Sequence, residues 1–219
     1  DNRDIFYDPS KGYYLIDRFG IYGILPGDIE EEHYIRNDIK AEIFWTLWNL
    51  PIGDNWAFKG VFGLHTGLSF LFPQPGNKNP IVEDVNKLYI DGMFNGRGWV
   101  GERNNRGYAL WENWAELRIP IVPGMIAVDG FFDIAEIASE PSRIFADDPL
   151  ATNGSFIDRL RFSFGGGLRF AIPQFPFRFL FAKRFRFENG NFTWQRGAIG
   201  GGSGNGGIDF VLSFALSTY

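Results

Sequence analysis

The stretch RLRFSFGGGLRFAIPQFPFRFLFAKRFRF, residues 159–187, carries the clearest structural signal in this chain. From Leu160 onward the apolar residues share one parity, and arginine, serine, glycine and alanine share the other. Successive side chains of a strand point to opposite faces of its sheet, so this pattern predicts one apolar face and one cationic, glycine-spaced face. Pro173 and Pro176 interrupt the alternation, and phenylalanines at every second position from 175 to 181 predict the second strand of a β-hairpin.

The hairpin alone leaves open which of its faces meets water. In a soluble sandwich or ligand-binding barrel the phenylalanine face would be the core and the arginine face would meet solvent. In a membrane barrel the phenylalanine face would meet lipid, and the arginine face would line a polar interior. The rest of the chain decides between these alternatives.

Six further stretches alternate in the same way, which brings the expected number of antiparallel strands to about eight: 13–23, 34–48, 56–71, 109–119, 125–137 and 208–216. The connections near residues 12, 49, 120 and 172 are short, whereas those after residues 23, 71, 137 and 187 are longer. Short turns at one rim and long loops at the other are typical of outer-membrane barrels, and a soluble sandwich has no reason to keep that rule. The sequence therefore predicts an all-β fold, an antiparallel transmembrane β-barrel.

Composition excludes several other classes. The net charge of −5 argues against a nucleic-acid partner, and the absence of cysteine excludes disulfide scaffolds and thiol chemistry. The sequence contains no run of about 18 apolar residues, so it predicts no transmembrane helix. The chain has no recognisable signal peptide, and its first residues read as the middle of a longer protein, so we expect a mature fragment.

The longest loop, residues 72–108, contains the motif Asn95-Gly96-Arg97-Gly98-Trp99. Alone, an arginine between glycines is a weak signal and is more often a solvated loop tip. Parity, however, puts Glu116 on the polar face of strand 109–119 and Asp133 on the polar face of the next strand. Two acids that face a partly dry interior are unfavourable unless a cation meets them. Glu116 could also pair with a wall arginine such as Arg118 or Arg169.

Several motifs, in order along nearly the whole chain, resemble those of the BamA-type outer-membrane insertases. The tripeptide Arg97-Gly98-Trp99 is similar to the Arg-Gly-aromatic motif in the sixth extracellular loop of that family. The runs 115–120 and 131–133 resemble the two strand motifs that follow it. Residues 1–12 resemble the turn before the ninth strand of the family, and residues 165–170 resemble its fourteenth strand.

The resemblance implies that residues 1–219 are the C-terminal part of an outer-membrane barrel, strands nine to sixteen of sixteen. The N-terminal periplasmic repeats and the first barrel strands would then be absent here; the other reading is a reduced eight-stranded barrel. The family's loop folds into the lumen, so Arg97 would pair with Glu116 and Asp133, and Gly98 would allow close backbone approach. The last strand would border a lateral seam through Phe210, Leu212, Phe214 and Leu216.

The implied function is the assembly and insertion of β-barrel proteins into the bacterial outer membrane. Expected partners are the lipid bilayer with its lipopolysaccharide, unfolded outer-membrane protein clients and accessory assembly lipoproteins. A secretion pore of the same superfamily and a passive porin are the alternatives. We expect no enzyme, cofactor or metal, because no nucleophile or acid/base pair is evident, and a glycosidase dyad of Glu116 and Asp133 is disfavoured by the neighbouring arginine. His65 is expected to be a wall polar group, and Arg159, Arg161 and Arg169 are expected to form a solvated lumen wall.

Overall fold

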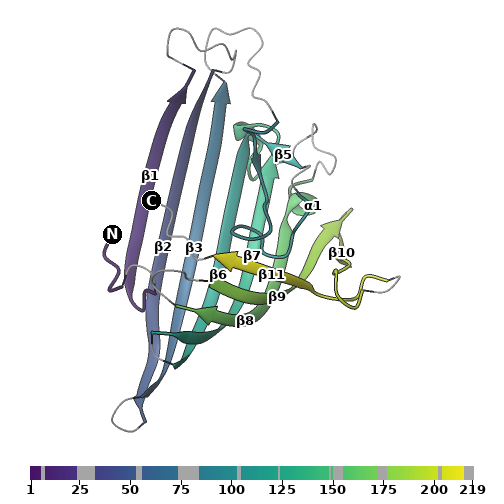
Figure 1. Cartoon of the computed structure of the whole chain (residues 1–219). Coiled ribbons are helices and arrows are strands. Elements are labelled where there is room, and N and C mark those ends of the chain that lie inside the picture. Colours follow the sequence, from purple (N-terminus) through teal and green to yellow (C-terminus); the bar gives the residue numbers. More distant parts are fainter. Residues whose placement is uncertain are drawn as a thin grey trace.

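The computed structural model describes residues 1–5, 8–23, 33–52, 56–73, 84–102, 105–122, 124–147, 149, 155–171, 177–201 and 204–214. Its main element is one antiparallel sheet in which the long strands follow one another in chain order (Figure 1). These strands are β1 (Gly12–Tyr22), β2 (Tyr34–Pro51), β3 (Ala57–Pro73), β6 (Ala109–Val122), β7 (Ile126–Ala138), β8 (Arg161–Phe170), β9 (Phe177–Glu188) and β11 (Asp209–Phe214). All eight predicted strands, and the antiparallel β8–β9 hairpin, are confirmed.

The shorter elements were not predicted, because segments of two to four residues carry too little alternation to recognise. They are β4 (Leu88–Tyr89), β5 (Arg106–Gly107), β10 (Asn191–Trp194), the 3-10 helix η2 (Pro141–Arg143) and the helix α1 (Phe156–Arg159). The expected turn at Pro120 begins later than predicted, since β6 runs on to Val122. Its pairing with β7 is irregular between Pro120 and Val122. Pro120 has no N–H group to donate, and such a residue is tolerated where the pairing is interrupted.

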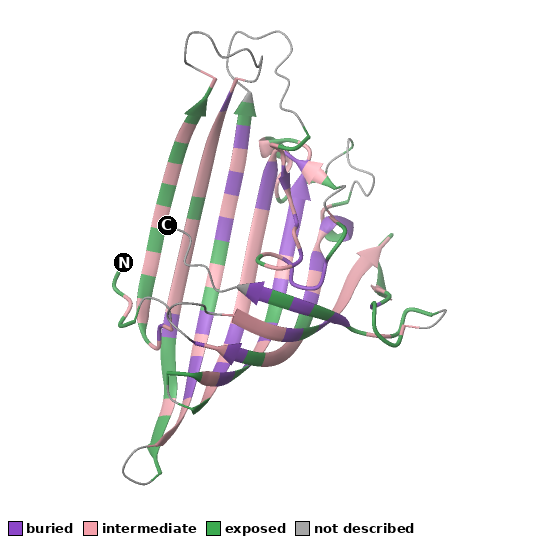
Figure 2. Ribbon diagram, in the orientation of Figure 1, coloured by how far each residue is buried: buried purple, intermediate pink, exposed green. Residues whose placement is uncertain are grey.

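The two faces of the sheet differ as a membrane barrel requires. Exposed side chains on the outer face include Leu15, Phe164 and Phe181, at 65%, 40% and 47% exposure. On the inner face, Asp133 and Ser163 are buried at 1% and 0%. Figure 2 shows the resulting alternation of exposed and buried residues along the strands. The apolar face is therefore outside and the polar face inside, the reverse of a soluble sandwich.

Among the residues that the structure describes, no helix is both long enough and apolar enough to cross a membrane.

The sheet is curved and open. Within the described residues, β1 pairs only with β2, and β11 pairs only with β9. The hairpin-like segment that carries β4 and β5 lies beside β3, β6 and β7 at the concave side of the sheet (Figure 1). The described strands thus form part of a barrel wall with a folded loop against its inner face.

Glycines allow an unusually close approach between β8 and β9. A Cβ atom added at Gly165 would lie 1.8 Å from the carbonyl oxygen of Phe181, and one at Gly167 would lie 1.8 Å from that of Phe179. Both distances are far inside van der Waals contact, so no other residue type fits without moving a strand. The glycine spacing of the inner face is therefore a packing requirement of this part of the wall.

Candidate functional site

The tip of the long loop is held in shape by its own polar groups. One carboxylate oxygen of Asp91 accepts hydrogen bonds from the backbone N–H groups of Met93 and Phe94, each at 2.7 Å. The N–H of Gly98 donates to the carbonyl oxygen of Gly92 at 2.9 Å. These bonds close a compact turn, which presents Arg97 to the barrel wall in a defined orientation.

Arg97 is 3% exposed and donates hydrogen bonds to Asp133 of β7 from both its side chain and its backbone. Its Nη2 atom donates to Oδ1 of Asp133 at 2.6 Å, and its Nε atom donates to Oδ2 at 2.8 Å. The backbone N–H of Arg97 donates to the same Oδ2 atom at 2.9 Å. The guanidinium also lies over the ring of Phe131, 4.0 Å from its centroid. A two-pronged contact of this kind needs the planar fork of arginine, which lysine lacks.

The second carboxylate, Glu116 of β6, is shared among four arginines. Arg97 Nη1 and Arg178 Nη1 each donate to Oε2 at 2.9 Å. Arg118 donates to Oε1 at 3.3 Å, and Arg169 donates to the same oxygen. Glu116 therefore pairs with the loop arginine and with the wall arginines simultaneously, so the two pairings weighed for it in the sequence are not exclusive.

The ion cluster extends beyond the residues singled out in the sequence. Arg169 Nε donates to Asp129 at 2.7 Å, and Arg118 Nη1 donates to Asp8 at 2.5 Å. Asp129, Arg178 and Asp8 were not identified beforehand. Asp129 shares the parity of Asp133, a signal that could have found it, whereas the approach of Asp8 depends on the folded position of the segment before β1.

The described cluster is balanced in charge, with four arginines facing four carboxylates: Arg97, Arg118, Arg169, Arg178, Asp8, Glu116, Asp129 and Asp133. Burial alone would lower the pKa of Arg97, but Asp133 and Glu116 outweigh it and raise that pKa above its ordinary value. The guanidinium of Arg97 is therefore held in its charged form between Asp133 and Glu116.

The two residues that follow Arg97 also contact the wall. Gly98 has a φ of +92°, and a Cβ atom there would lie 2.8 Å from the Cβ atom of Ala182 in β9. Trp99 is 1% exposed, and its indole N–H donates to the carbonyl oxygen of Phe162 in β8 at 3.1 Å. All three motif residues thus pack against the inner face.

The expectation of a solvated wall at Arg159, Arg161 and Arg169 is wrong. The three residues are between 3% and 4% exposed. Arg159 contacts Glu136 and two backbone carbonyls, and Arg161 contacts Glu102 at 3.4 Å. The physical reason is that the loops fold over the inner face, so its arginines need internal partners instead of water.

The residues expected at the seam lie on the last strand. Phe210 and Leu212 are exposed on the outer face, and β11 pairs with β9 from Asp209 to Phe214. The side chain of Phe214 and the whole of Leu216 lie outside the described part of the chain. The structure does not bring Phe210 or Leu212 into contact with Arg97, but the loop touches Ala182, which is the partner of Asp209 in the β9–β11 register.

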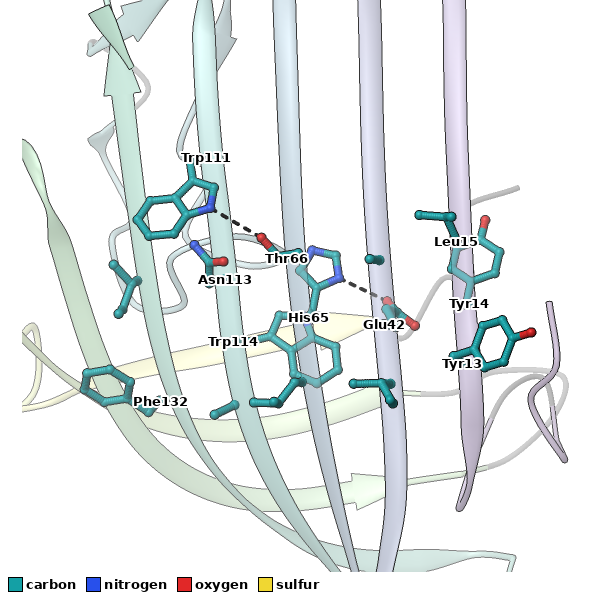
Figure 3. Close-up of a pocket in the computed structure, with 15 residues that line it drawn as sticks. Tyr13, Tyr14, Leu15, Glu42, His65, Thr66, Trp111, Asn113, Trp114 and Phe132 are labelled. Carbon is teal, nitrogen blue, oxygen red and sulfur yellow. Dashed lines mark hydrogen bonds and ion pairs between the residues drawn. The ribbon is translucent and has the colours of Figure 1, made fainter. Parts of the chain in front are cut away.

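A separate apolar pocket of about 690 Å³ is lined from strands β1, β2, β3, β6 and β7 (Figure 3). His65 is one of the lining residues; it lies between Glu42 and Glu112, with nitrogen–oxygen distances of 3.2 and 3.5 Å, and stacks on Trp114. Trp111 donates to Thr66 at 3.3 Å. In the described residues no group of three or more histidines and acids is arranged to hold a metal ion.

Comparison with known proteins agrees with this geometry. A family model described as Omp85 superfamily domain matches residues 1–210. The chain is 34% identical over 213 residues to a protein of Treponema pallidum (strain Nichols) named "Putative outer membrane protein assembly factor". That alignment covers 87% of this chain but 24% of the relative, so the chain spans about a quarter of the relative's length. These similarities locate the chain in the bacterial outer membrane, and it belongs to the Omp85 superfamily.

Proposed function

We propose that this chain forms part of an assembly factor that folds and inserts β-barrel proteins into the bacterial outer membrane. Its clients are unfolded outer-membrane proteins, and they enter through a lateral seam along β11. The activity makes and breaks no covalent bond. It requires an exposed strand edge, a wall that can hold that edge in place, and contact with the surrounding bilayer and its lipopolysaccharide.

The observation that carries the proposal is the position of β11 at an edge of the described sheet. Within the described part of the chain β11 pairs with β9 alone, so the backbone groups on its other side pair with no described strand. A row of unpaired N–H and C=O groups is a template for another strand. A client strand in transit between water and lipid carries the same unpaired groups, and pairing satisfies both sets.

The long loop, held to the wall through Arg97, contacts the sheet next to this edge on its inner face. Gly98 packs on Ala182, and Ala182 is the register partner of Asp209 at the start of β11. Arg97 fixes the loop to β6 and β7 through Glu116 and Asp133. We propose that the motif Arg97-Gly98-Trp99 holds β9, and with it the seam strand, in a position that accepts clients. Accessory assembly lipoproteins are further proposed partners.

A proline substitution on the seam strand tests the proposal. The antiparallel bridge between Ile199 and Ile208 shows that the backbone groups of Ile208 point away from β9, so those of Phe210 and Leu212 do as well. Leu212→Pro therefore removes an N–H from the free edge without removing a bond to β9. Leu212→Ala is the matched control, because it shortens the side chain and keeps the N–H.

The assay is the insertion of an unfolded client into liposomes that contain the full-length protein, read by protease protection of the folded client. We expect Leu212→Pro to insert several-fold more slowly than Leu212→Ala, with both variants folded by heat-modifiable gel mobility. Equal rates for the two variants would refute insertion through this edge. A steady ionic conductance in planar bilayers without any insertion activity would favour the passive porin, and vectorial transport of a soluble client would favour a secretion pore.

A further inference from the structure

The last strand contains a surplus of residues between its two parts. Trp194 of β10 faces Phe185, and Asp209 of β11 faces Ala182. From Trp194 to Asp209 the chain advances by fifteen residues, whereas their partners on β9, Phe185 and Ala182, are three residues apart. Twelve residues between β10 and β11 therefore have no counterpart on β9. β10 and β11 are thus two parts of one edge strand, separated by a loop between Gln195 and Ile208 that leaves the sheet and returns to it.

The loop is fastened at its base on both faces of the sheet. On the outer face, the Nζ atom of Lys183 donates to the carbonyl oxygens of Gln195, Asn205 and Gly207, at 3.1, 2.9 and 2.8 Å. A lysine that points outward in a lipid-facing strand is costly, and three carbonyls compensate its charge. The base of the loop is therefore held to β9 by hydrogen bonds.

On the inner face, Arg184 joins the loop to the start of β11. Its Nε atom donates to Asp209 at 2.7 Å, and its Nη2 atom donates to the carbonyl oxygen of Arg196 at 2.7 Å. The other carboxylate oxygen of Asp209 accepts the backbone N–H of Ala198 at 3.0 Å. The first residues of the loop are thereby drawn toward the beginning of β11.

This arrangement puts Ile199 against the free edge of the seam strand. Ile199 and Ile208 exchange both backbone hydrogen bonds, each at 2.9 Å, as an antiparallel pair. Alternate residues of a strand direct their backbone groups to opposite edges, so Ile208 shares its edge with Phe210 and Leu212. Ile199 occupies the position at which the next residue of an incoming strand would pair.

We infer that the loop between Gln195 and Ile208 is a built-in stop, which ends strand pairing along the free edge of β11 at Ile208. The inference rests on the proposed function and makes it more specific, because it defines how far a client strand can pair toward β10. A client strand can form backbone hydrogen bonds with Phe210 and Leu212, but it cannot pair with Ile208, which is already paired with Ile199. The loop thereby sets the register in which clients engage.

The surplus allows a variant that removes the stop without shifting the register. Deleting residues 196–207 takes out twelve residues and joins Gln195 to Ile208. The N–H of Gln195 donates to the carbonyl oxygen of Arg184, and Ile208 already precedes the residue that faces Ala182. After the deletion Ile208 therefore remains level with Lys183, and the edge strand becomes continuous.

The experiment uses the full-length protein with a stalled client whose terminal strand carries a cysteine at successive positions. Single cysteines replace Ile208, Phe210 or Leu212, in a segment that has no cysteine of its own. In the parent we expect disulfide formation with the client at positions 210 and 212, and about tenfold less at position 208, because two backbone hydrogen bonds must first open there. In the deletion variant the yield at position 208 should rise to that at position 212.

Equal yields at positions 208 and 212 in the parent would overturn the inference, as would an unchanged low yield at 208 in the deletion variant. Absence of crosslinks at positions 210 and 212 would instead overturn insertion through this edge. A second measurement needs no client. The N–H of Ile208 donates to the carbonyl oxygen of Ile199, so deleting residues 196–207 should expose the amide of Ile208 to hydrogen exchange. Equal protection of that amide in the parent and in the deletion variant would show that the loop does not close the edge.

Discussion

Replacing Arg97 by alanine should release the long loop from the barrel wall. Among the residues that the structure describes, Arg97 is the only cation that contacts the carboxylate of Asp133. Alanine keeps the backbone N–H that donates to Asp133, but it removes the three side-chain bonds to that residue and the bond to Glu116. Asp133 would then be a buried charge with no opposite charge beside it.

The expected size of the effect follows from this difference between the two acids. Removing one partner of a buried ion pair costs about 3–5 kcal/mol of unfolding free energy, and Asp133 meets that condition. Glu116 keeps Arg118, Arg169 and Arg178, so its share of the loss is small. In double-mutant cycles the coupling of Arg97→Ala with Asp133→Ala should therefore exceed its coupling with Glu116→Ala by about 1 kcal/mol or more.

The measurement is urea unfolding of the full-length protein in detergent micelles, followed by tryptophan fluorescence and heat-modifiable mobility. Arg97→Lys should fall between the parent and Arg97→Ala, since lysine keeps the charge but cannot bridge two carboxylates. Arg36→Ala is the control, because Arg36 pairs with Asp38 at 2.7 Å and its side chain is 39% exposed. That variant should lose less than about 1 kcal/mol.

The reasoning about the pinned loop fails if Arg97→Ala unfolds within about 0.5 kcal/mol of the parent, the range of an ordinary surface substitution. It also fails if the couplings to Asp133 and Glu116 are equal. Equal couplings would mean that the three wall arginines do not compensate Glu116.

Three further predictions concern the loop and the turn before β1. Gly98→Ala should cost about 1–3 kcal/mol more than Gly101→Ala in the same unfolding assay, because both glycines have positive φ, at +92° and +104°, but only at Gly98 would the new methyl group meet the wall. Trp99→Phe should cost about 1 kcal/mol through loss of the indole hydrogen bond to β8, and an unchanged unfolding midpoint would contradict that bond. Burial alone would raise the pKa of Asp4, but hydrogen bonds from the hydroxyl and N–H of Ser10 and other backbone amides outweigh it and lower that pKa to about 2. The carboxylate therefore stabilises the turn fully above its ordinary pKa of 3.8, and this contribution is lost as the pH falls through about 2; a carbon-13 carboxyl titration with a midpoint near 3.8 would contradict this.

The strands and the sides on which they bury their residues could be predicted from the sequence, because alternation is a local property. Parity alone put Glu116 and Asp133 on the inner face, and both are buried there. The same reasoning put Phe210 and Leu212 on the outer face, where they are exposed. For these residues the prediction needs nothing beyond the period of two that a strand imposes.

The contents of the lumen could not be predicted in this way, because they depend on contacts between distant parts of the chain. Arg169 has the pattern of a solvated wall residue, and only the folded arrangement brings it to Glu116 and Asp129. The division of the last strand was also hidden, since residues 195–207 read as an ordinary glycine-rich connection. Their return to β9 in a register twelve residues later becomes visible only from the strand pairing.

The glycine-lined contact of β8 with β9 has a consequence for how this wall can vary. Gly165 is the register partner of Ala182 on the neighbouring strand, and Gly98 of the loop lies against Ala182 from the lumen side, so three of the smallest residues meet at one point of the inner face. The loop and the two strands are closely packed there, with no space for a larger side chain. Enlarging any one of them would push the next, so homologous barrels that keep the tucked loop should change these three positions together or not at all.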